Sequence, residues 1–341
     1  MTTSQAPHHP ASLLGLQGLP RPSLVRYLAR AAAFDRDATS VPSVGARRVV
    51  ANVFLEDSTR TRTSFSIAAR RLSSIVVDLA SAGSSVSKGE TLVDTARNIE
   101  AMGADVLVVR ARESGAAAAV AAGVRCPVIN AGDGKHEHPT QGLLDLYTIA
   151  KEFGRLGSFD LSGLRVLIVG DANSSRVARS LIAGATTLGA SVCCVAPPAL
   201  ASRSLASLGT EIERSLDDAL PGADAVVMLR IQFERHLPDS KPAEGQARAT
   251  PTIASIREYR AGYALTPERA SLMKPGAIVM HPGPMNRNLE LDAEVADGPR
   301  SRIMAQVHHG VLVRMAAIER CLTSDEAAGP AEWTTQREAK M

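Results

Sequence analysis

One short polar stretch of the chain, residues 58–62, has the composition of a phosphate-binding site. It reads STRTR and joins an apolar run of strand length to a segment whose apolar residues recur at helical spacing. Ser58 or Thr59 is a good N-cap, so free backbone N–H groups and the positive end of the helix dipole would meet there. Two guanidinium groups and three hydroxyls lie alongside. Because surface helix starts favour Asp and Glu over cations, the pattern favours a receptor for a dianion over an ordinary capped helix.

Further polar side chains follow other predicted strands. Arg110 comes directly after the apolar run at residues 105–109, and His138 and Gln141 come after the run at residues 127–130 and a glycine-bearing loop. In parallel sheets flanked by helices, ligands bind at the carboxyl ends of the strands. Each side chain alone could be a capping or solvated residue, but their shared placement predicts that they converge with the STRTR stretch on one crevice.

The elements that must position these residues alternate between strand and helix patterns in the first half of the chain. Apolar runs of strand length lie at residues 49–55, 75–80, 105–109 and 127–130. Helical patterns lie at residues 60–72, 90–102, 113–122 and 139–153. Such alternation predicts a parallel sheet flanked by helices.

A second unit of the same kind follows a glycine-containing linker at residues 151–162. Its predicted strands lie at residues 165–169, 191–196, 223–229 and 277–280. Predicted helices outside the first unit lie at residues 22–34, 176–188 and 311–322. Residues 1–19, rich in Pro, Gly, Ser and His, are expected to form a frayed arm. The sequence therefore predicts an α/β protein with two doubly wound parallel-sheet domains joined by interdomain helices.

Composition excludes several classes of partner. The chain has 341 residues, of which 45% are hydrophobic and 21% charged, as in soluble globular proteins. A net charge of +3 with 3% aromatic residues argues against nucleic acid. No apolar run reaches the roughly 18 residues of a spanning helix, and no secretory signal is recognisable at the start. We therefore expect a cytoplasmic protein with no membrane partner.

Neither a metal nor a cofactor is expected. The four cysteines lack the CxxC spacing of zinc sites, so buried free thiols are their predicted state. His136, Glu137 and His138 lie too close in sequence to converge on a metal without a distant ligand. At the start of a helix that begins with Pro139, His138 suits a hydrogen bond to a carbonyl group better.

The STRTR stretch resembles the carbamoyl phosphate signature of the aspartate and ornithine carbamoyltransferase family. Further stretches match the family in order over residues 45–320, namely SSVSKGE, HPTQ, RIQFER and HPGP. RIQFER, residues 230–235, resembles the aspartate-binding motif of aspartate carbamoyltransferases. The cysteine-bearing turn and the Ser-Met-Gly run of ornithine carbamoyltransferases are absent here. The resemblance is therefore to the aspartate-specific members.

This resemblance implies a carbamoyl phosphate site and a role for its residues. The implied site consists of Ser58, Thr59, Arg60, Thr61, Ser84, Lys88, Arg110, His138, Gln141, Pro282 and Gly283. The implied catalytic residues are Arg60, Thr61, Lys88, Arg110 and His138. Thr61, Arg110 and His138 would polarise the carbamoyl oxygen. Gln141 and the carbonyl groups of residues 282–283 would hold the carbamoyl amino group.

An aspartate site is implied in the same way. Its residues would be Lys88, Arg176, Arg230, Gln232, Gly283 and Pro284. Arg176 would hold the α-carboxylate, and Arg230 with Gln232 the side-chain carboxylate, because a planar guanidinium suits a planar carboxylate. The HPGP turn is stiff, and the resemblance implies that its Gly283-Pro284 bond is cis.

The implied reaction transfers the carbamoyl group of carbamoyl phosphate to the amino group of L-aspartate, in pyrimidine biosynthesis. In the family the loop matching SSVSKGE crosses a subunit boundary, which implies a homotrimer with shared active sites, Ser84 and Lys88 coming from the neighbour. Regulatory or dihydroorotase-like chains could bind outside that trimer. In the family the last helix returns to the first domain. The implied division is residues 1–150 with 308–322 as the carbamoyl phosphate-binding domain, 151–307 as the aspartate-binding domain, and 323–341 as a loosely ordered tail.

Two alternatives stay open on the sequence alone. The enzyme could pass the carbamoyl group to a different amino acid, such as ornithine. The chain could instead be a non-catalytic phosphate-binding or assembly partner with the same fold. The intact set of STRTR, Lys88, HPTQ and RIQFER favours catalysis.

Overall fold

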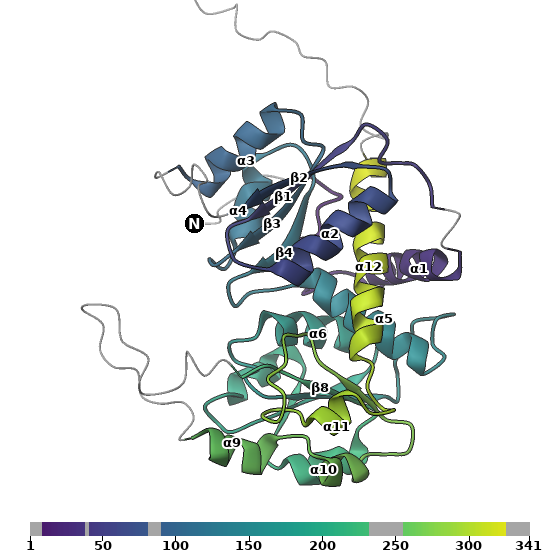
Figure 1. Cartoon of the computed structure of the whole chain (residues 1–341), viewed down its shortest axis with the longest axis vertical. Helices are drawn as coiled ribbons and strands as arrows, with labels where there is room; N and C mark the ends of the chain where they lie inside the picture. Colours follow the sequence, from purple (N-terminus) through teal and green to yellow (C-terminus); the bar gives the residue numbers. More distant parts are fainter. Residues whose placement is uncertain (1–8, 38–40, 81–89, 232–254, 325–341) are drawn as a thin grey trace, which may run out of the picture.

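The structure, a computed structural model, describes residues 9–37, 41–80, 90–231 and 255–324. Figure 1 shows two α/β domains, one above the other, with the last helix rising from the second domain along the first. Each domain is built on its own parallel sheet. The predicted fold class, two doubly wound parallel-sheet domains, is therefore confirmed.

The first domain holds a four-stranded sheet in the order β2-β1-β3-β4, with every pairing parallel. Its strands are β1 (Val49–Phe54), β2 (Ile75–Ala80), β3 (Val106–Ala111) and β4 (Val128–Asp133). β1, β3 and β4 are buried along nearly their whole length, which explains why they are near-continuous apolar runs in the sequence. The pairing of β3 with β4 shifts register between Val109 and Ala111, so the irregularity falls at Arg110, one residue before the end of β3.

Helices cover both faces of this first sheet. They are α1 (Arg21–Arg36), α2 (Thr59–Arg71), α3 (Leu92–Ala101), α4 (Ala116–Gly123) and α5 (Pro139–Glu152). On one face, Ile99 of α3 and Val120 of α4 share a core with Leu107 of β3. On the other face, Phe65 of α2 joins Val50 of β1 in a core that also includes α1 and α5.

The second domain holds a five-stranded parallel sheet in the order β7-β6-β5-β8-β9. Its strands are β5 (Arg165–Val169), β6 (Ser191–Val195), β7 (Glu211–Glu213), β8 (Ala225–Met228) and β9 (Ile278–Met280). Its helices are α6 (Arg176–Thr187), α7 (Leu216–Ala219), α9 (Ile256–Tyr263), α10 (Pro267–Ser271) and α11 (Ala293–Ala296), with 3-10 turns η2 (Arg203–Leu208) and η3 (Leu220–Gly222). The sequence did not predict β7, since a three-residue edge strand with two glutamates carries no apolar run.

The last helix, α12 (Ile303–Ser324), begins earlier than predicted. The sequence pattern predicted a start at residue 311, after Gly310, and that prediction is wrong. A Cβ at residue 310 would lie 2.5 Å from Arg314 Nη1 and 3.1 Å from Leu144 Cδ2, so glycine lets this helix pass close to α5. Within the described ranges, no helix is both long enough and apolar enough to cross a bilayer.

The segment before α1 corrects a second expectation. Residues 9–19 are described and are not a frayed arm: Leu13 forms a parallel bridge with Ile129 of β4, and Leu16 is fully buried. The carboxylate of Glu137 accepts hydrogen bonds from the backbone N–H groups of Leu16 (2.7 Å) and Gln17 (3.0 Å). These contacts join residues about 120 positions apart, so the local composition could not reveal them. Residues 1–8 and 325–341 lie outside the described ranges.

Close packing of α5 on α6 leads to a stability prediction. A Cβ at Gly142 would lie 2.7 Å from Leu16 Cδ1 and 3.0 Å from the backbone carbon of Ser180. We expect Gly142→Ala to lower the free energy of unfolding by about 1–3 kcal/mol in urea denaturation, because the two helices must move apart. The matched control is Gly262→Ala in α9, where the described residues place no atom within 4 Å of the new Cβ apart from the helix's own neighbouring backbone. That change should be neutral or stabilising by about 0.5–1 kcal/mol, and equal losses in both variants would contradict the packing argument.

Candidate active site

A cleft with a volume of about 1130 Å³ lies at the carboxyl ends of both sheets. All the predicted site residues that the structure describes line it. They are Ser58, Thr59, Arg60, Thr61, Arg110, His138, Gln141, Arg176, Arg230, Pro282, Gly283 and Pro284. Ser84, Lys88 and Gln232, which were also predicted, lie outside the described residues. The convergence expected from strand order is therefore present in the tertiary structure.

The start of α2 presents backbone N–H groups to the cleft. Ser58 is the N-cap residue, but its side chain makes no capping hydrogen bond, and the first turn contains no acidic residue. Arg60 extends across the cleft to the second domain, where a Cβ added to Gly283 would lie 3.3 Å from Arg60 Cζ. Gly283 has a φ of +68°, so glycine both permits this backbone conformation and leaves space for the guanidinium. An anion at this point would meet N–H groups, a helix dipole and a guanidinium together.

Arg110 lies deeper in the cleft, with a side chain that is 12% exposed. Its Nη1 donates to the carbonyl oxygen of Ala131 (3.2 Å) and to Thr61 Oγ1 (3.4 Å). Burial, together with the positive charge of Arg176, lowers the pKa of Arg110 to about 10, while Glu56 opposes that change. The group therefore remains a cation at neutral pH.

Glu56 joins the two domains and is a residue to which the sequence analysis gave no role. Its Oε1 accepts from Arg110 Nη2 (2.7 Å) and from Arg176 Nη2 (2.6 Å), and its Oε2 accepts from Arg176 Nη1 (3.2 Å). Burial alone would raise the pKa of Glu56, but the hydrogen bond from Arg176 and the two positive charges lower it overall. An acidic residue two positions before a basic signature was the signal available in the sequence.

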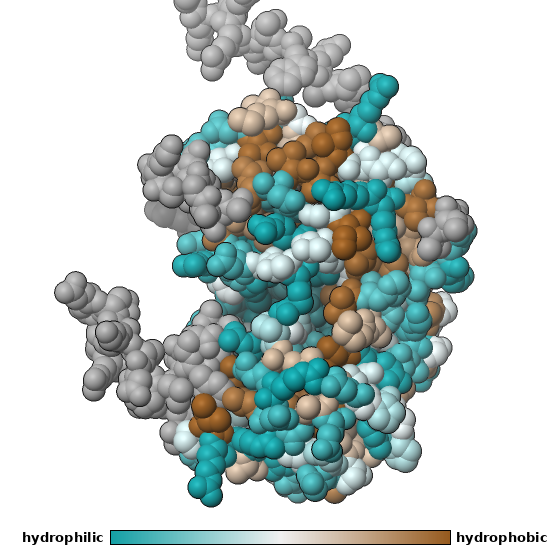
Figure 2. Space-filling view, viewed as in Figure 1, coloured by the Kyte–Doolittle hydropathy of each residue, from teal (hydrophilic) through white to brown (hydrophobic). Residues whose placement is uncertain are grey.

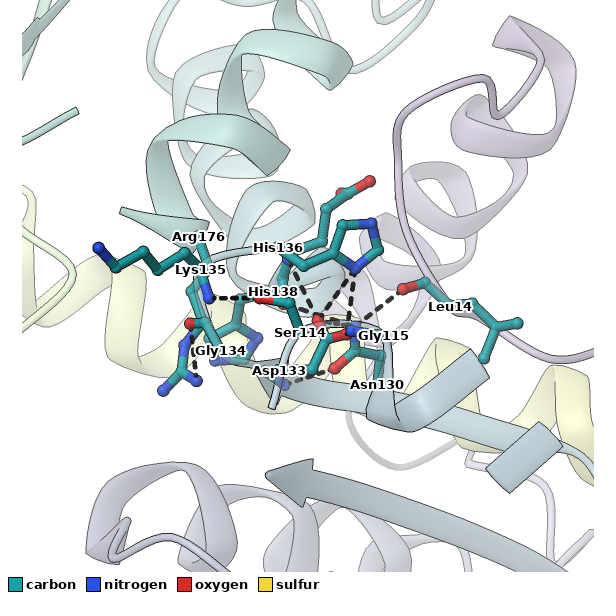
Figure 3. Close-up of polar contacts among 12 residues, drawn as sticks. Leu14, Ser114, Gly115, Asn130, Asp133, Gly134, Lys135, His136, His138 and Arg176 are labelled. Carbon is teal, nitrogen blue, oxygen red and sulfur yellow. Dashed lines mark hydrogen bonds and ion pairs between the residues drawn. The ribbon is translucent and has the colours of Figure 1, made fainter. Parts of the chain in front are cut away.

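The loop between β4 and α5 is organised by the buried carboxylate of Asp133, on which the dashed lines of Figure 3 converge. Asp133 accepts from Gly115 N (2.7 Å) and Asn130 Nδ2 (2.8 Å), and it contacts His136 Nδ1 (3.1 Å). Figure 3 shows Arg176 beside Gly134, whose carbonyl oxygen lies 3.5 Å from Arg176 Nη1. This loop thus brings a backbone carbonyl group of the first domain next to the Arg176 guanidinium of the second.

The three residues of the His-Glu-His run have separate partners. His136 contacts Asp133, as described above. Glu137 accepts from the N-terminal segment and from Ser180 Oγ (2.8 Å). His138 lines the cleft. Within the described residues, no group of three or more His, Cys, Asp or Glu side chains is arranged to hold a metal ion.

His138 is a buried histidine at the N-cap of α5. Its backbone N–H donates to Ser180 Oγ (2.9 Å), and among the described residues its ring Nδ1 has no hydrogen-bond partner. Burial, followed by the positive charges of Arg110, Arg176 and Arg314, lowers the pKa of His138 well below its usual range. A neutral imidazole can donate one hydrogen bond to a carbonyl oxygen without adding another charge to this cationic cleft.

The HPGP turn that follows β9 closes the cleft from the second domain. The Gly283-Pro284 bond is cis, as the resemblance implied. The N–H of Gly283 donates to His281 Nδ1 (2.8 Å), and the other ring nitrogen of His281 lies 3.2 Å from Glu290 Oε1. The backbone N–H of His281 donates to Gln306 Oε1 (2.9 Å). Side chains therefore hold the turn at both of these N–H groups.

Comparison with known families covers almost the whole chain. Residues 11–151 match the model described as aspartate/ornithine carbamoyltransferase, carbamoyl-P binding domain. Residues 162–321 match the model described as aspartate/ornithine carbamoyltransferase, Asp/Orn binding domain.

Individual proteins and structures agree with these matches. The chain is 50% identical over 309 residues to the aspartate carbamoyltransferase catalytic subunit of Myxococcus xanthus, covering 91% of this chain and 98% of that protein. It is 46% identical over 316 residues to the subunit of the same name from Gluconacetobacter diazotrophicus, covering 92% and 93%. Aspartate transcarbamoylase from Trypanosoma cruzi, solved with carbamoyl phosphate and aspartate, superposes with a TM-score of 0.77 at 30% identity, covering 93% of this chain and 98% of that one.

The buried position of His138 leads to a pH prediction. Because its pKa is depressed, its ring nitrogen NMR shifts should keep neutral-form values from about pH 5.5 to about pH 8, instead of titrating near 6.5. The unfolded chain binds a proton at His138 more readily than the folded chain does. Burial of the neutral ring therefore does not lower the free energy of unfolding above the unfolded pKa, but that free energy falls as the pH drops below the unfolded pKa. The NMR signal of the His138 ring is the one that disappears in a His138→Asn variant. A titration of that signal with a midpoint near 6.5 would show that the ring is not desolvated as described.

Proposed function

The chain belongs to the aspartate/ornithine carbamoyltransferase family, and we infer from this that it transfers the carbamoyl group of carbamoyl phosphate to the amino group of L-aspartate. The products are N-carbamoyl-L-aspartate and phosphate, so the reaction belongs to pyrimidine biosynthesis. One observation carries this function. The start of α2, which is suited to bind a phosphate, and Arg176 and Arg230, which are suited to bind carboxylates, line the same cleft. The neighbouring structures solved with carbamoyl phosphate, aspartate or N-(phosphonacetyl)-L-aspartic acid support the same substrates.

We propose that carbamoyl phosphate binds first, with its phosphate at the start of α2. Residues 58–61 would supply N–H groups and hydroxyls, and Arg60 and Arg110 the positive charge. Thr61, Arg110 and His138 would donate to the carbamoyl oxygen and stabilise the oxyanion, each well-placed donor contributing about 3 kcal/mol. The hydrogen bond between Arg110 and Thr61, and the position of all three side chains in the lining of the cleft, support this assignment.

The amino group of carbamoyl phosphate would be held by Gln141 and by the carbonyl oxygens of residues 282–283. Aspartate would bind beside it, with its α-carboxylate on Arg176, its side-chain carboxylate on Arg230 and Gln232, and further contacts to Lys88 and residues 283–284. Its uncharged amine forms the new C–N bond, the C–O bond to phosphate breaks, and the amine proton goes to the departing phosphate. Positioning then replaces covalent catalysis.

Glu56 would change partners during this cycle. In the structure its single carboxylate pairs with both Arg110 and Arg176. When the substrate anions bind these guanidinium groups, the negative charge of the substrates takes over that role. Closure of the two domains would expel water and complete the site.

The domain division that we propose gives residues 1–150 with 308–322 to carbamoyl phosphate and residues 151–307 to aspartate. It is supported by the return of α12, whose Ile318 and Leu312 share a core with α1 and α5. The ion pair of Arg30 in α1 with Glu319 in α12 (2.6 Å) adds to that contact.

A homotrimer with shared sites is the assembly that we propose. Ile67 on α2 and Ile75 and Val77 on the edge strand β2 are 41%, 53% and 42% exposed. A contiguous exposed apolar patch is typical of a protein–protein interface. Figure 2 shows apolar side chains gathered in the upper part of the view, where Figure 1 places β2. The segment with Ser84 and Lys88 follows β2 directly in the sequence.

Two further parts of the proposal concern the surroundings of the trimer. A cytoplasmic location is supported by the free thiols, three of which, Cys193, Cys194 and Cys321, are buried. Regulatory or dihydroorotase-like chains would bind outside the trimer.

The direct test is product formation by the purified chain with carbamoyl phosphate and either L-aspartate or ornithine. We expect carbamoylaspartate and no citrulline, because the chain carries the RIQFER run and lacks the cysteine-bearing turn of the ornithine enzymes. Citrulline as the main product would reassign the acceptor. No product from either substrate, in a preparation shown to be trimeric, would favour the non-catalytic alternative.

Shared active sites are tested with two inactive variants. Arg60→Ala and Lys88→Ala should each lower kcat by at least about 100-fold, since each removes a charge that holds the reacting phosphate. Trimers dissociated and reassembled from a mixture of the two should regain activity, because some sites then combine an intact Arg60 with an intact Lys88 from the neighbour. If the mixture stays as inactive as its parents, Lys88 serves its own chain and the shared site is wrong.

A further inference from the structure

We propose that Asp145 is a positioning residue that makes the site selective for the amino end of carbamoyl phosphate. It acts through the side-chain amide of Gln141 and, by way of Gln306, through the turn at residues 281–284. The inference rests on the proposed function, since it deepens the role given there to Gln141.

Asp145 lies on α5 one turn after Gln141 and is completely buried. A single oxygen, Asp145 Oδ1, accepts from Gln141 Nε2 (2.9 Å) and from Gln306 Nε2 (2.8 Å). Gln141 and Gln306 both line the cleft, whereas Asp145 stands behind them. The carboxyl group therefore contacts no ligand space itself, and any effect on the substrate must pass through the two amides.

The hydrogen bonds determine which end of each amide faces Asp145. Gln306 Oε1 accepts from the backbone N–H of His281 (2.9 Å), so its Nε2 must be the end that reaches Asp145. Asp145 Oδ1 is an acceptor, so Gln141 must also direct its Nε2 there. The oxygen of the Gln141 amide is then the end left for the cleft. The Gln141 amide thus presents a hydrogen-bond acceptor to the cleft. If this amide were rotated by half a turn, it would present a donor instead.

This orientation does not depend on the protonation state of Asp145. Burial raises its pKa to about 7, against the hydrogen bonds from Gln306 and Gln141 and the charge of Arg314. If the group takes up a proton, Oδ2 can carry it, because among the described residues that atom has no hydrogen-bond partner. Oδ1 then remains an acceptor as a carbonyl oxygen. Both amides keep the same direction in either form.

The second branch of the network reaches the HPGP turn. Gln306 holds the N–H of His281, and His281 Nδ1 in turn accepts from Gly283 N (2.8 Å). Asp145 Oδ1 thus links two sets of acceptors. The first domain supplies the Gln141 amide oxygen, and the second supplies the carbonyl oxygens of Pro282 and Gly283 in the turn. A carbamoyl amino group has two N–H donors and can use acceptors from both sides. A methyl group in the same place can use neither, so the network selects carbamoyl phosphate over acetyl phosphate.

A purely structural role for Asp145 makes a different prediction. If Asp145 only accepted hydrogen bonds from two buried amides, it would stabilise the fold. Its loss would then weaken the binding of all ligands of the cleft equally. A positioning role affects only ligands that carry the amino group. Inorganic phosphate and acetyl phosphate share the phosphate site but lack that group, so they separate the two roles.

The central experiment compares Asp145→Leu with Asp145→Asn in the full chain. The readouts are kcat, the KM for carbamoyl phosphate, and the competitive inhibition constants of inorganic phosphate and acetyl phosphate. For Asp145→Leu we expect the KM for carbamoyl phosphate to rise and kcat to fall, each about tenfold, because the Gln141 amide is free to rotate. Both inhibition constants should stay within about twofold, so discrimination against acetyl phosphate falls by the same factor of about ten.

Asp145→Asn is the conservative variant and should restore selectivity to within about threefold of the original chain. Its Oδ1 can accept from both amides, and turning its NH2 toward them would set donor against donor. Thr148→Val is the matched control for packing between α5 and α12, since Thr148 Oγ1 contacts His309 Nδ1 (2.8 Å) without lining the cleft. That control should leave the selectivity between carbamoyl and acetyl phosphate unchanged, whatever it does to the melting temperature.

Gln306→Met keeps the inference testable if Asp145→Leu does not fold. It removes the link to His281 and should raise the KM for carbamoyl phosphate about threefold, with no change for inorganic phosphate. The inference is overturned if folded variants leave selectivity unchanged, or if all three ligands weaken by one common factor. Gln141→Ala separates it from the proposed function: loss of carbamoyl phosphate affinity there, but not in Asp145→Leu, rejects only the role of Asp145. An original chain that makes no carbamoylaspartate rejects the proposed function itself.

Discussion

The guanidinium groups gathered at one cleft set the electrostatic constraint on which the rest of the structure depends. Arg60 and Arg110 come from the first domain and Arg176 from the second. Cations so arranged repel one another, and the burial of Arg110 removes much of the water that would screen them. Glu56 supplies a negative charge between Arg110 and Arg176 and so connects the domains. A cleft balanced in this way is suited to exchange an internal carboxylate for the charges of small dianions.

The cationic cleft requires a rigid frame, and buried carboxyl groups supply much of it. Asp133 holds the loop that reaches Arg176, and Glu137 attaches the N-terminal segment behind that loop. Glu290 supports the HPGP turn through His281. Each of these carboxyl groups accepts at least two hydrogen bonds, which is how a buried carboxyl group offsets the cost of leaving water. The polar residues of the cleft are therefore supported by carboxyl groups that do not themselves line it.

Such a frame suits a reaction carried out by positioning. The depressed pKa of His138 keeps its ring neutral, so it can donate to a carbonyl oxygen without adding to the charge of the arginines. The start of α2 offers N–H groups that the Ser58 side chain does not cap. Preorganised donors of this kind are effective because they do not have to reorient while charge develops on the substrate. The two domains each contribute part of the set, so the distance between them controls whether the set is complete.

The sequence by itself predicted the described strands other than β7, most of the described helices, and twelve residues that line the cleft. Buried parallel strands require apolar runs, and these are visible in the sequence. The STRTR and HPGP runs are also local signals, because each is formed by a few consecutive residues. Tertiary structure alone decided the partners of Glu56, the pairing of Asp145 with Gln306, the order of residues 9–19 and the edge strand β7. Glu56 and Arg176 are 120 positions apart, and Asp145 and Gln306 are 161 apart. Contacts over such separations arise only when whole domains pack, and no local periodicity of the chain encodes them.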